Sequence, residues 1–186
     1  MDRDSYNAGD YFNKLDYSYA THNFGIGLPL AGNNQVNWDL MAPVLRNPLI
    51  KPATADIIRA KGYFTDMLAI RKDSTLFRLR TAADISERLR FYNVGPNQVG
   101  GLIVMAIDGA TPRPYDGANH KGVVVLFNVD KVPATVTVPE LGGRTLSVHP
   151  VQQRSTSDTL ARTSTYNSAN GTFTVPGRTT VVFVQD

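Results

Sequence analysis

The hydrophobic positions of this chain follow two different periods, which divide it into a helical stretch and a β-rich part. Within residues 52–80, apolar side chains recur at steps of three and four, and this spacing predicts one long helix over about 54–72. Pro52 or Thr54 suits the first turn, and Lys72 suits the negative end of the helix dipole. Gly62 is the weak point, at a cost of about 1 kcal/mol relative to alanine. The predicted stripe consists of Ile57, Ala60, Phe64, Met67, Leu68 and Arg71.

The apolar stripe needs a packing partner, and the sequence leaves two possibilities open. The helix covers the flank of a larger barrel, or it is a core helix packed against the β-rich part that follows. Spacing alone favours the second alternative.

From residue 89 onward the chain consists of short apolar runs separated by Gly, Pro and Asn. The runs LIVMAI and GVVVLFNV are continuously apolar, as expected for strands buried on both faces. Asn170-Gly171 predicts a hairpin between Tyr166 and Phe173. About eight short strands at this spacing predict a mainly β fold with an antiparallel β-sandwich. The expected strands are Leu89–Val94, Leu102–Ile107, Gly122–Val129, Ala134–Val138, Thr145–Val148, Thr159–Arg162, Thr172–Val175 and Thr179–Val184.

Residues 1–50 form a different region, in which aromatic side chains alternate with Asp, Asn and Arg. The segment 24–38 shows no helical or strand period, and so irregular loops are expected there. Short helical turns are expected at 39–46 and 48–50, broken by Pro43 and Pro48. After the long helix, residues 81–88 predict a capped helical turn, with Thr81 as the cap.

Composition narrows the class of protein. The 186 residues are 42% hydrophobic and 19% charged, which is typical of a globular protein, and the net charge is only +3. The basic excess is mixed with acids rather than gathered in a block, which argues against nucleic-acid binding. Without cysteine, the chain has no disulfide, zinc–thiolate site or thiol catalysis. No apolar run is long enough to cross a bilayer, and the acidic, polar N-terminus is not a signal peptide.

The acids near the N-terminus are the first candidates for chemistry. They could hold a sugar or a metal, act as a glycosidase pair, or simply be solvated loop acids and caps. A helix–loop–helix calcium site does not fit, because its twelfth position counted from Asp2 is Asn13 rather than glutamate. The neighbouring aromatics either bind sugar rings or form a small core. The acids are Asp2, Asp4, Asp10 and Asp16, accompanied by Arg3 and Asn13.

The three histidines are His22, His120 and His149. They lie far apart in the sequence, and none has a histidine or carboxylate at a spacing typical of metal ligands. Structural or surface roles are therefore expected for them, and no metal site is predicted.

Several longer motifs resemble a known family. The segments DRDSYNAGDYFNKLDYSYATHNFGIGLP, NNQVNWDLM, IRKDSTLFRLRTAADI, SVHPVQQRSTSDTLAR and FTVPGRTTVVFV occur in this order over essentially the whole chain. They resemble the end of type I pullulanases and plant-type limit dextrinases, the α-1,6-debranching enzymes of glycoside hydrolase family 13. DSYNAGDYFN and STLFRLRTA are the most specific pieces.

The resemblance implies an architecture. Residues 1–80 would be the end of a catalytic (β/α)8 barrel, namely loops on its active-site face and its last helix at 54–72. Residues 81–186 would be the C-terminal β-sandwich. The helix stripe would then face a barrel, contrary to the preference from spacing. The family's catalytic aspartate, glutamate and second aspartate precede this segment, so no catalytic residue is expected here and the segment alone is expected to be inactive.

The resemblance also implies substrate contacts at Arg3, Asp10 and Asn13. Arg3 would donate to sugar hydroxyls, while Asp10 and Asn13 would either bind sugar or brace the loop. The sequence departs from the family at Tyr11 and Phe24, where tryptophan is usual, and at Asp39, where proline is common. Val36 replaces a frequent aspartate and removes a possible sugar ligand.

The implied partner is an α-glucan such as pullulan, limit dextrin or amylopectin, reached through the barrel. No cofactor is expected, although the family can bind structural calcium. Without its barrel, the stripe over 54–72 is expected to drive self-association. The compartment would be secreted or periplasmic in a bacterium and the plastid in a plant. The main alternative is a stand-alone β-sandwich that binds starch without catalysis.

Overall fold

The computed structural model describes residues 16–20, 28 and 31–186. The chain divides into two units, Met1–Lys61 and Gly62–Asp186. This division reflects contacts within the chain, so the predicted domain boundary at residues 80 and 81 stays a prediction. Among the described residues, no helix is both long and apolar enough to cross a membrane.

Residues 31–50 of the first unit are mostly helical. Where irregular loops were expected, residues 31–37 form two short helical segments instead. Pro43 lies inside α3 without ending it, so the expected break is wrong there, and the Arg46 N–H reaches the Ala42 carbonyl oxygen beyond it. Pro48 begins a 3-10 turn that the Asn47 side chain caps by accepting from the Leu49 N–H. The elements are α2 (Ala31–Asn34), η2 (Gln35–Asn37), α3 (Trp38–Leu45) and η3 (Pro48–Ile50).

Helix α4 (Thr54–Asp73) runs from the first unit into the second and confirms the predicted helix. It does not continue to residue 80, because Ser74 leaves the helical conformation and its side chain accepts from the Leu76 N–H. The 3-10 helix η4 (Thr75–Arg78) follows. Helix α5 (Ala82–Arg88) is the predicted capped turn, since the Thr81 hydroxyl accepts from the Asp84 N–H at 3.0 Å.

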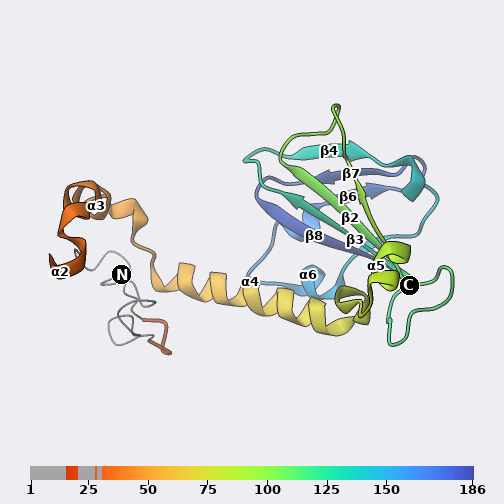
Figure 1. Cartoon of the computed structure of the whole chain (residues 1–186), viewed down its shortest axis with the longest axis horizontal. Helices are drawn as coiled ribbons and strands as arrows, with labels where there is room; N and C mark the ends of the chain where they lie inside the picture. The colour runs from red at the N-terminus through yellow and green to blue at the C-terminus, as the bar shows by residue number, and fades with distance from the viewer. Residues whose placement is uncertain (1–15, 21–27, 29–30) are drawn as a thin grey trace. The chain divides into compact units, whose positions relative to one another are not determined.

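The second unit is a sandwich of two antiparallel sheets, as predicted (Figure 1). The larger sheet has the strand order β1-β2-β3-β8-β5 and the smaller has the order β4-β7-β6. The strands of the larger sheet are β1 (Leu89–Tyr92), β2 (Leu102–Asp108), β3 (Gly122–Asn128), β5 (Ser147–Val148) and β8 (Thr179–Gln185). Those of the smaller sheet are β4 (Ala134–Thr137), β6 (Thr165–Asn167) and β7 (Thr172–Val175).

The central strands β3 and β8 of the larger sheet are buried on both faces, which explains the continuous apolar run of β3. The inner face of this sheet packs on the smaller sheet, where the rings of Phe173 and Phe183 meet edge to face at 5.4 Å between centroids. Its outer face, including Val123 and Val125, packs against Ile70 of α4 and against η4. The expectation of a strand buried on both faces is confirmed for β3. It holds only in part for β2, where Ile103 is 51% exposed.

The predicted strand at 159–162 is wrong. That segment leads into the 3-10 helix η6 (Ala161–Thr163). The Ala161 N–H donates to Asp158 Oδ1 at 3.2 Å. The hairpin at Asn170-Gly171 is confirmed, since Tyr166 lies opposite Phe173 and Gly171 has a φ of 72°.

Candidate functional site

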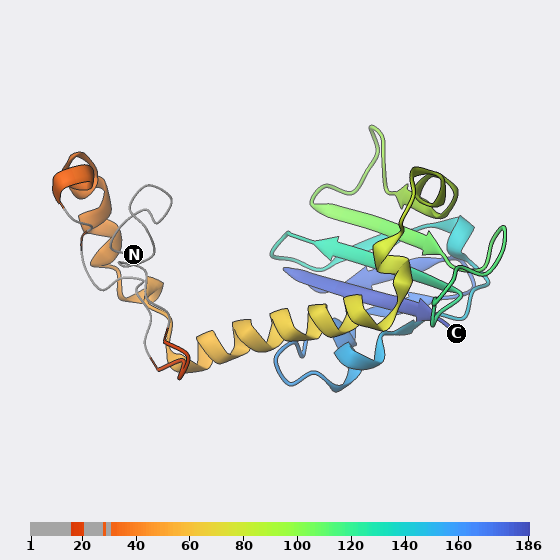
Figure 2. The ribbon, with the colours of Figure 1, turned by 60° about the horizontal axis from the view of Figure 1, so that its bottom comes forward.

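Helix α4 meets the sandwich along one face, formed by Gly62, Asp66, Ile70 and Asp73. These residues recur at intervals of four, four and three, so they lie on one side of the helix. The Ser155 hydroxyl donates to Asp66 Oδ2 at 2.6 Å, and Ile70 is 3% exposed within the outer-face core. Helix α6 (Pro150–Arg154) lies beside this part of α4 in both views (Figure 1 and Figure 2). We call the side of α4 that carries Gly62, Asp66, Ile70 and Asp73 the docking face.

Gly62 allows the closest approach along the docking face. A Cβ at this position would lie 2.0 Å from Ser157 Oγ and 2.9 Å from Ser157 Cβ, so any side chain would push the 155–158 loop away. The propensity cost of glycine inside a helix is therefore offset by packing that only glycine permits.

The stripe predicted from the sequence lies on nearly the opposite side of α4. Phe64 is 63% exposed and Leu68 is 49% exposed, while Met67 at the edge of the stripe touches the outer-face core. For a helix with 3.6 residues per turn, the two faces are separated by about 160°. We call Ala60, Phe64, Leu68 and Arg71 the exposed face of α4.

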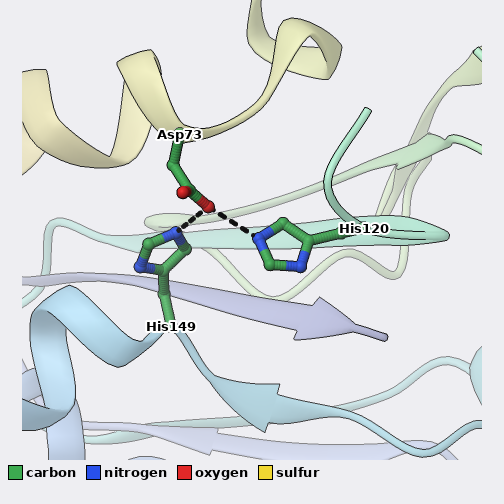
Figure 3. Close-up of side chains that lie close together, drawn as sticks. All are labelled: Asp73, His120 and His149. Atoms are coloured by element: carbon green, nitrogen blue, oxygen red, sulfur yellow. Dashed lines mark hydrogen bonds and ion pairs between the residues drawn. The ribbon is translucent and has the colours of Figure 1, made fainter. Parts of the chain in front are cut away.

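A polar cluster ends the docking face, and it contains two of the three histidines (Figure 3). Asp73 Oδ2 lies 2.8 Å from His120 Nε2 and 3.3 Å from His149 Nε2. His120 Nδ1 lies 2.6 Å from Asp186 Oδ1 at the other end of the ring. The cluster therefore joins the last residue of α4, the segment before β3, the start of α6 and the segment after β8. Sequence spacing could not have found it, because Asp73, His120 and His149 lie far apart in the sequence.

The hydrogen-bond partners decide which nitrogens carry protons. His149 Nδ1 accepts the Val151 N–H at 3.1 Å and caps α6, so its proton must be on Nε2, which donates to Asp73. Both nitrogens of His120 face carboxylate oxygens, so both bonds are made when this ring is an imidazolium. Asp73 accepts from both rings.

The electrostatics agree with this assignment. Burial lowers the pKa of His149, although the neighbouring Asp73 charge and hydrogen bond act in the opposite direction. Burial by itself would raise the pKa of Asp73, but the hydrogen bonds and charges of His120 and His149 outweigh it and hold that pKa below its usual value. His149 is therefore held neutral and Asp73 ionised.

The same three residues could be considered as metal ligands, since one ligand atom from each lies within 4.8 Å of the others. A metal needs an unprotonated nitrogen from each histidine. His149 fails this requirement, because Nδ1 is occupied by the Val151 N–H and Nε2 carries the proton. The geometry fits a hydrogen-bonded clasp between α4 and the sandwich better than a metal centre, and the expected absence of a metal in this segment stays a prediction.

The predicted substrate-binding residues, Arg3, Asp10 and Asn13, lie outside the described residues, as do Tyr11 and His22. Of the four N-terminal acids, Asp16 is described. Its Oδ1 accepts from the Ser18 N–H at 2.8 Å and from the Ser18 hydroxyl at 2.5 Å, so it braces a turn. Val36 is 88% exposed in η2.

Comparisons with known proteins extend over the whole chain. Residues 19–186 match the family model described as "Alpha-1,6-glucosidases, pullulanase-type, C-terminal". Pullulanase 1, chloroplastic, of Arabidopsis thaliana is 44% identical over 189 aligned residues, covering 100% of this chain and 20% of that protein. A pullulanase of Klebsiella pneumoniae is 31% identical, covering 94% of this chain and 16% of that protein.

Solved structures agree. Apo pullulanase from Klebsiella pneumoniae superposes with a TM-score of 0.84 at 29% identity, covering 98% of this chain and 19% of that one. The maltotriose complex of PulA from the same organism gives a TM-score of 0.83 at 29% identity, covering 99% of this chain and 20% of that one.

Proposed function

This chain belongs to the family of C-terminal segments of pullulanase-type α-1,6-glucosidases. We propose that it is the C-terminal segment of an enzyme that hydrolyses α-1,6-glucosidic bonds in α-glucans. The chain spans about a fifth of the length of the curated relatives it matches, so this activity is that of a longer protein. Its substrates would be pullulan, limit dextrins or amylopectin. The maltotriose complex of a Klebsiella relative supports an α-glucan as the ligand.

The observation that carries the proposed role of this segment is the division of α4 into two faces. The docking face holds the helix to the sandwich, whereas the exposed face carries Phe64 and Leu68. Large apolar side chains on an exposed helix stripe are expected to have a partner. We assign that partner to the upstream catalytic barrel, of which α4 would be the last helix, and the sandwich would then hold α4 against it.

The chemistry would come from upstream residues through the retaining mechanism, in which two carboxyl groups about 5 Å apart act as nucleophile and acid/base. Within this chain, the Arg3 guanidinium would donate to sugar hydroxyls. The Asp10 carboxylate would accept hydrogen bonds from sugar hydroxyls, and the Asn13 amide would donate to them. Alternatively, both side chains would brace the loop that carries Arg3.

The alternative of a stand-alone starch-binding module is less well supported. Such modules on β-sandwiches would present a row of exposed aromatic rings to the glucan. Among the strand residues that the structure describes, Phe91 is the exposed aromatic side chain, at 53%. A single ring does not form a row.

The test is the release of reducing sugar from pullulan by three proteins: this chain alone, the chain joined to the upstream barrel, and the barrel without residues 81–186. Of the three proteins, only the one that joins the chain to the upstream barrel is expected to be active. Hydrolysis by the 186 residues alone would refute the proposed role, and Asp2, Asp4, Asp10 and Asp16 would become the residues to mutate.

Without the barrel, we expect this chain to self-associate through the predicted stripe over 54–72, in which Phe64 and Leu68 are exposed. Sedimentation velocity at increasing concentration measures this directly. Phe64→Ser should reduce the association, because it removes a large exposed apolar ring without touching the docking face. A chain that stays monomeric at high concentration would contradict the expectation.

A further inference from the structure

A cavity of about 470 Å³ opens at the end of the sandwich beside the edge strand β1. Its floor is apolar and comes from both the larger sheet and the segment that follows β4. Its wall is rich in arginine. The floor includes Ala106, Val124, Leu141 and Leu146, and the charged residues of the wall are Glu87, Arg88, Arg90, Asp108 and Arg144.

Arg88 is a buried cation without a carboxylate partner. It is 1% exposed, and its guanidinium donates to the carbonyl oxygens of Asp108, Thr111 and Arg113 at 3.2, 3.2 and 3.0 Å. It also lies 4.9 Å from the Tyr115 ring centroid, and its Nε has no hydrogen-bond partner. Neutral carbonyls accept three hydrogen bonds from the guanidinium but leave its charge uncompensated, and in a buried site that charge is weakly screened.

Two further guanidinium groups line the cavity. Arg90 donates through Nη1 to the Ser86 and Leu89 carbonyl oxygens, and Arg144 donates through Nη1 to Gln185 Oε1 at 3.4 Å. Among the ion pairs found in the described part of the chain, none involves Arg88, Arg90 or Arg144. The wall thus holds three cations that lack a carboxylate partner.

The fold brings Arg88 and Arg144 to the same end of β2 and β3. Asp108, whose carbonyl accepts from Arg88, lies directly opposite Gly122 in the sheet. A Cβ at Gly122 would lie 3.7 Å from Nη1 of Arg144. Directly opposed strand residues have Cα atoms about 5 Å apart, so the two guanidinium groups reach one small area from two sides.

The two acids of the wall offset this charge only in part. Glu87 is exposed, and Asp108 Oδ1 accepts from the N–H groups of Ala110 and Thr111, both at 2.8 Å. Three cations and two carboxylates leave an excess of one positive charge over an apolar floor.

We propose that this cavity binds a phosphomonoester carried by a hexose. Arginine matches phosphate oxygens with parallel N–H donors, and Arg90 and Arg144 would provide them. The positive charge of the buried Arg88 would attract the phosphate without contacting it. The Gln185 amide would hydrogen-bond the sugar, whose apolar ring face would lie on the floor. The volume is in the range of small-molecule sites and larger than a bare phosphate needs.

The experiment is calorimetric titration of the whole chain at low salt with glucose 6-phosphate, inorganic phosphate and glucose. Glucose 6-phosphate should bind more tightly than inorganic phosphate, and glucose should not bind measurably. Added sodium chloride should weaken the binding, because it screens the charges. Equal affinity for glucose and glucose 6-phosphate, or no heat with either phosphate, would overturn the proposal.

The matched variants are Arg144→Gln in the wall and Arg162→Gln on an exposed turn outside the cavity. Loss of one charged hydrogen bond should weaken binding about tenfold in Arg144→Gln and leave Arg162→Gln unchanged. Arg88 is left intact, because three backbone carbonyls depend on it. Thermal unfolding of each variant checks that it is folded, and unchanged affinity in a folded Arg144→Gln would refute the site.

Two sources share this ligand chemistry, namely a free hexose phosphate and a phosphoryl group on a glucan chain. A titration with phosphorylated maltotriose separates them. Tighter binding of the phosphorylated maltotriose than of glucose 6-phosphate assigns the site to modified glucan, and the reverse assigns it to a free metabolite. Neither result depends on the hydrolytic activity proposed above.

Discussion

The two faces of α4 follow different rules. The docking face uses a glycine, two aspartates and one isoleucine, and it is held by close backbone approach and specific hydrogen bonds. The exposed face carries the larger apolar side chains, including Phe64 and Leu68. The side of a helix that looks most hydrophobic is therefore not the side that its own domain uses. Matched substitutions on the docking face and elsewhere on α4 test this contrast.

The largest difference is expected between Ile70→Ala and Leu68→Ala. Ile70 is 3% exposed, so its truncation leaves a cavity and should lower the free energy of unfolding by about 3 kcal/mol. Leu68 is 49% exposed, and its truncation should cost less than about 1 kcal/mol. Urea unfolding of both variants measures this, and similar costs would mean that the faces are misassigned.

Gly62→Val should lower the free energy of unfolding by about 2 kcal/mol, because its side chain meets Ser157. Ala60→Val, on the exposed face, is the control and should cost only the few tenths of a kcal/mol expected from helix propensity. Adding Ser157→Gly to Gly62→Val should restore part of the stability. No recovery in the double variant would show that the close contact is not the cause.

Asp73→Asn should cost about 1.5 kcal/mol, since the buried His149 N–H and the His120 ring lose their charged acceptor. Asp56→Asn earlier in α4 is the matched control. Its ion pair with Arg59, at 3.8 Å, is exposed and should contribute little. Thermal unfolding at neutral pH compares the two variants. An equal loss of stability would show that the hydrogen bonds of Asp73 with His120 and His149 do not stabilise the packing of α4.

A smaller effect is expected from pH. Burial holds the pKa of His149 below the usual 6.5 in the folded chain, so the unfolded chain binds a proton first as the pH falls. The stability associated with neutral His149 is complete above pH 6.5 and declines as the pH falls from there toward the folded pKa. The lowered pKa of Asp73 adds a second loss, which begins only near 3.8.

The variant His149→Asn isolates this contribution. Asparagine can still accept the Val151 N–H as a helix cap, but it does not titrate. Unfolding free energies at pH 7.5 and 5.5 should therefore differ less in this variant than in the parent chain. An identical pH dependence would assign the loss to other groups.

Much of the fold could be predicted from the sequence. Continuous apolar runs such as Val123–Leu126 define strands buried on both faces, and Asn170-Gly171 places a hairpin, because both signals are local. The hydrophobic pattern wrongly predicts a strand at 159–162, because a side-chain cap such as that of Asp158 does not appear in such a pattern. The docking face was missed because Gly62 and Asp66 are not apolar.

The site was less predictable than the fold. Asp73, His120 and His149 come together only when α4, β3 and α6 pack, and their sequence spacing carries no trace of this. The resemblance of the N-terminal motif supplied Arg3, Asp10 and Asn13, which stay predictions because they lie outside the described residues.

The double use of the His149 ring has a practical consequence. One nitrogen holds the Val151 amide hydrogen while the other holds Asp73 at the end of α4. If the end of α4 moves away, the ring is released and the Val151 amide loses its acceptor. The rate at which this one amide exchanges with deuterium would then report, from within the sandwich, whether the end of α4 is seated. A single signal in an exchange experiment could follow the state of that helix end during assembly with a larger protein.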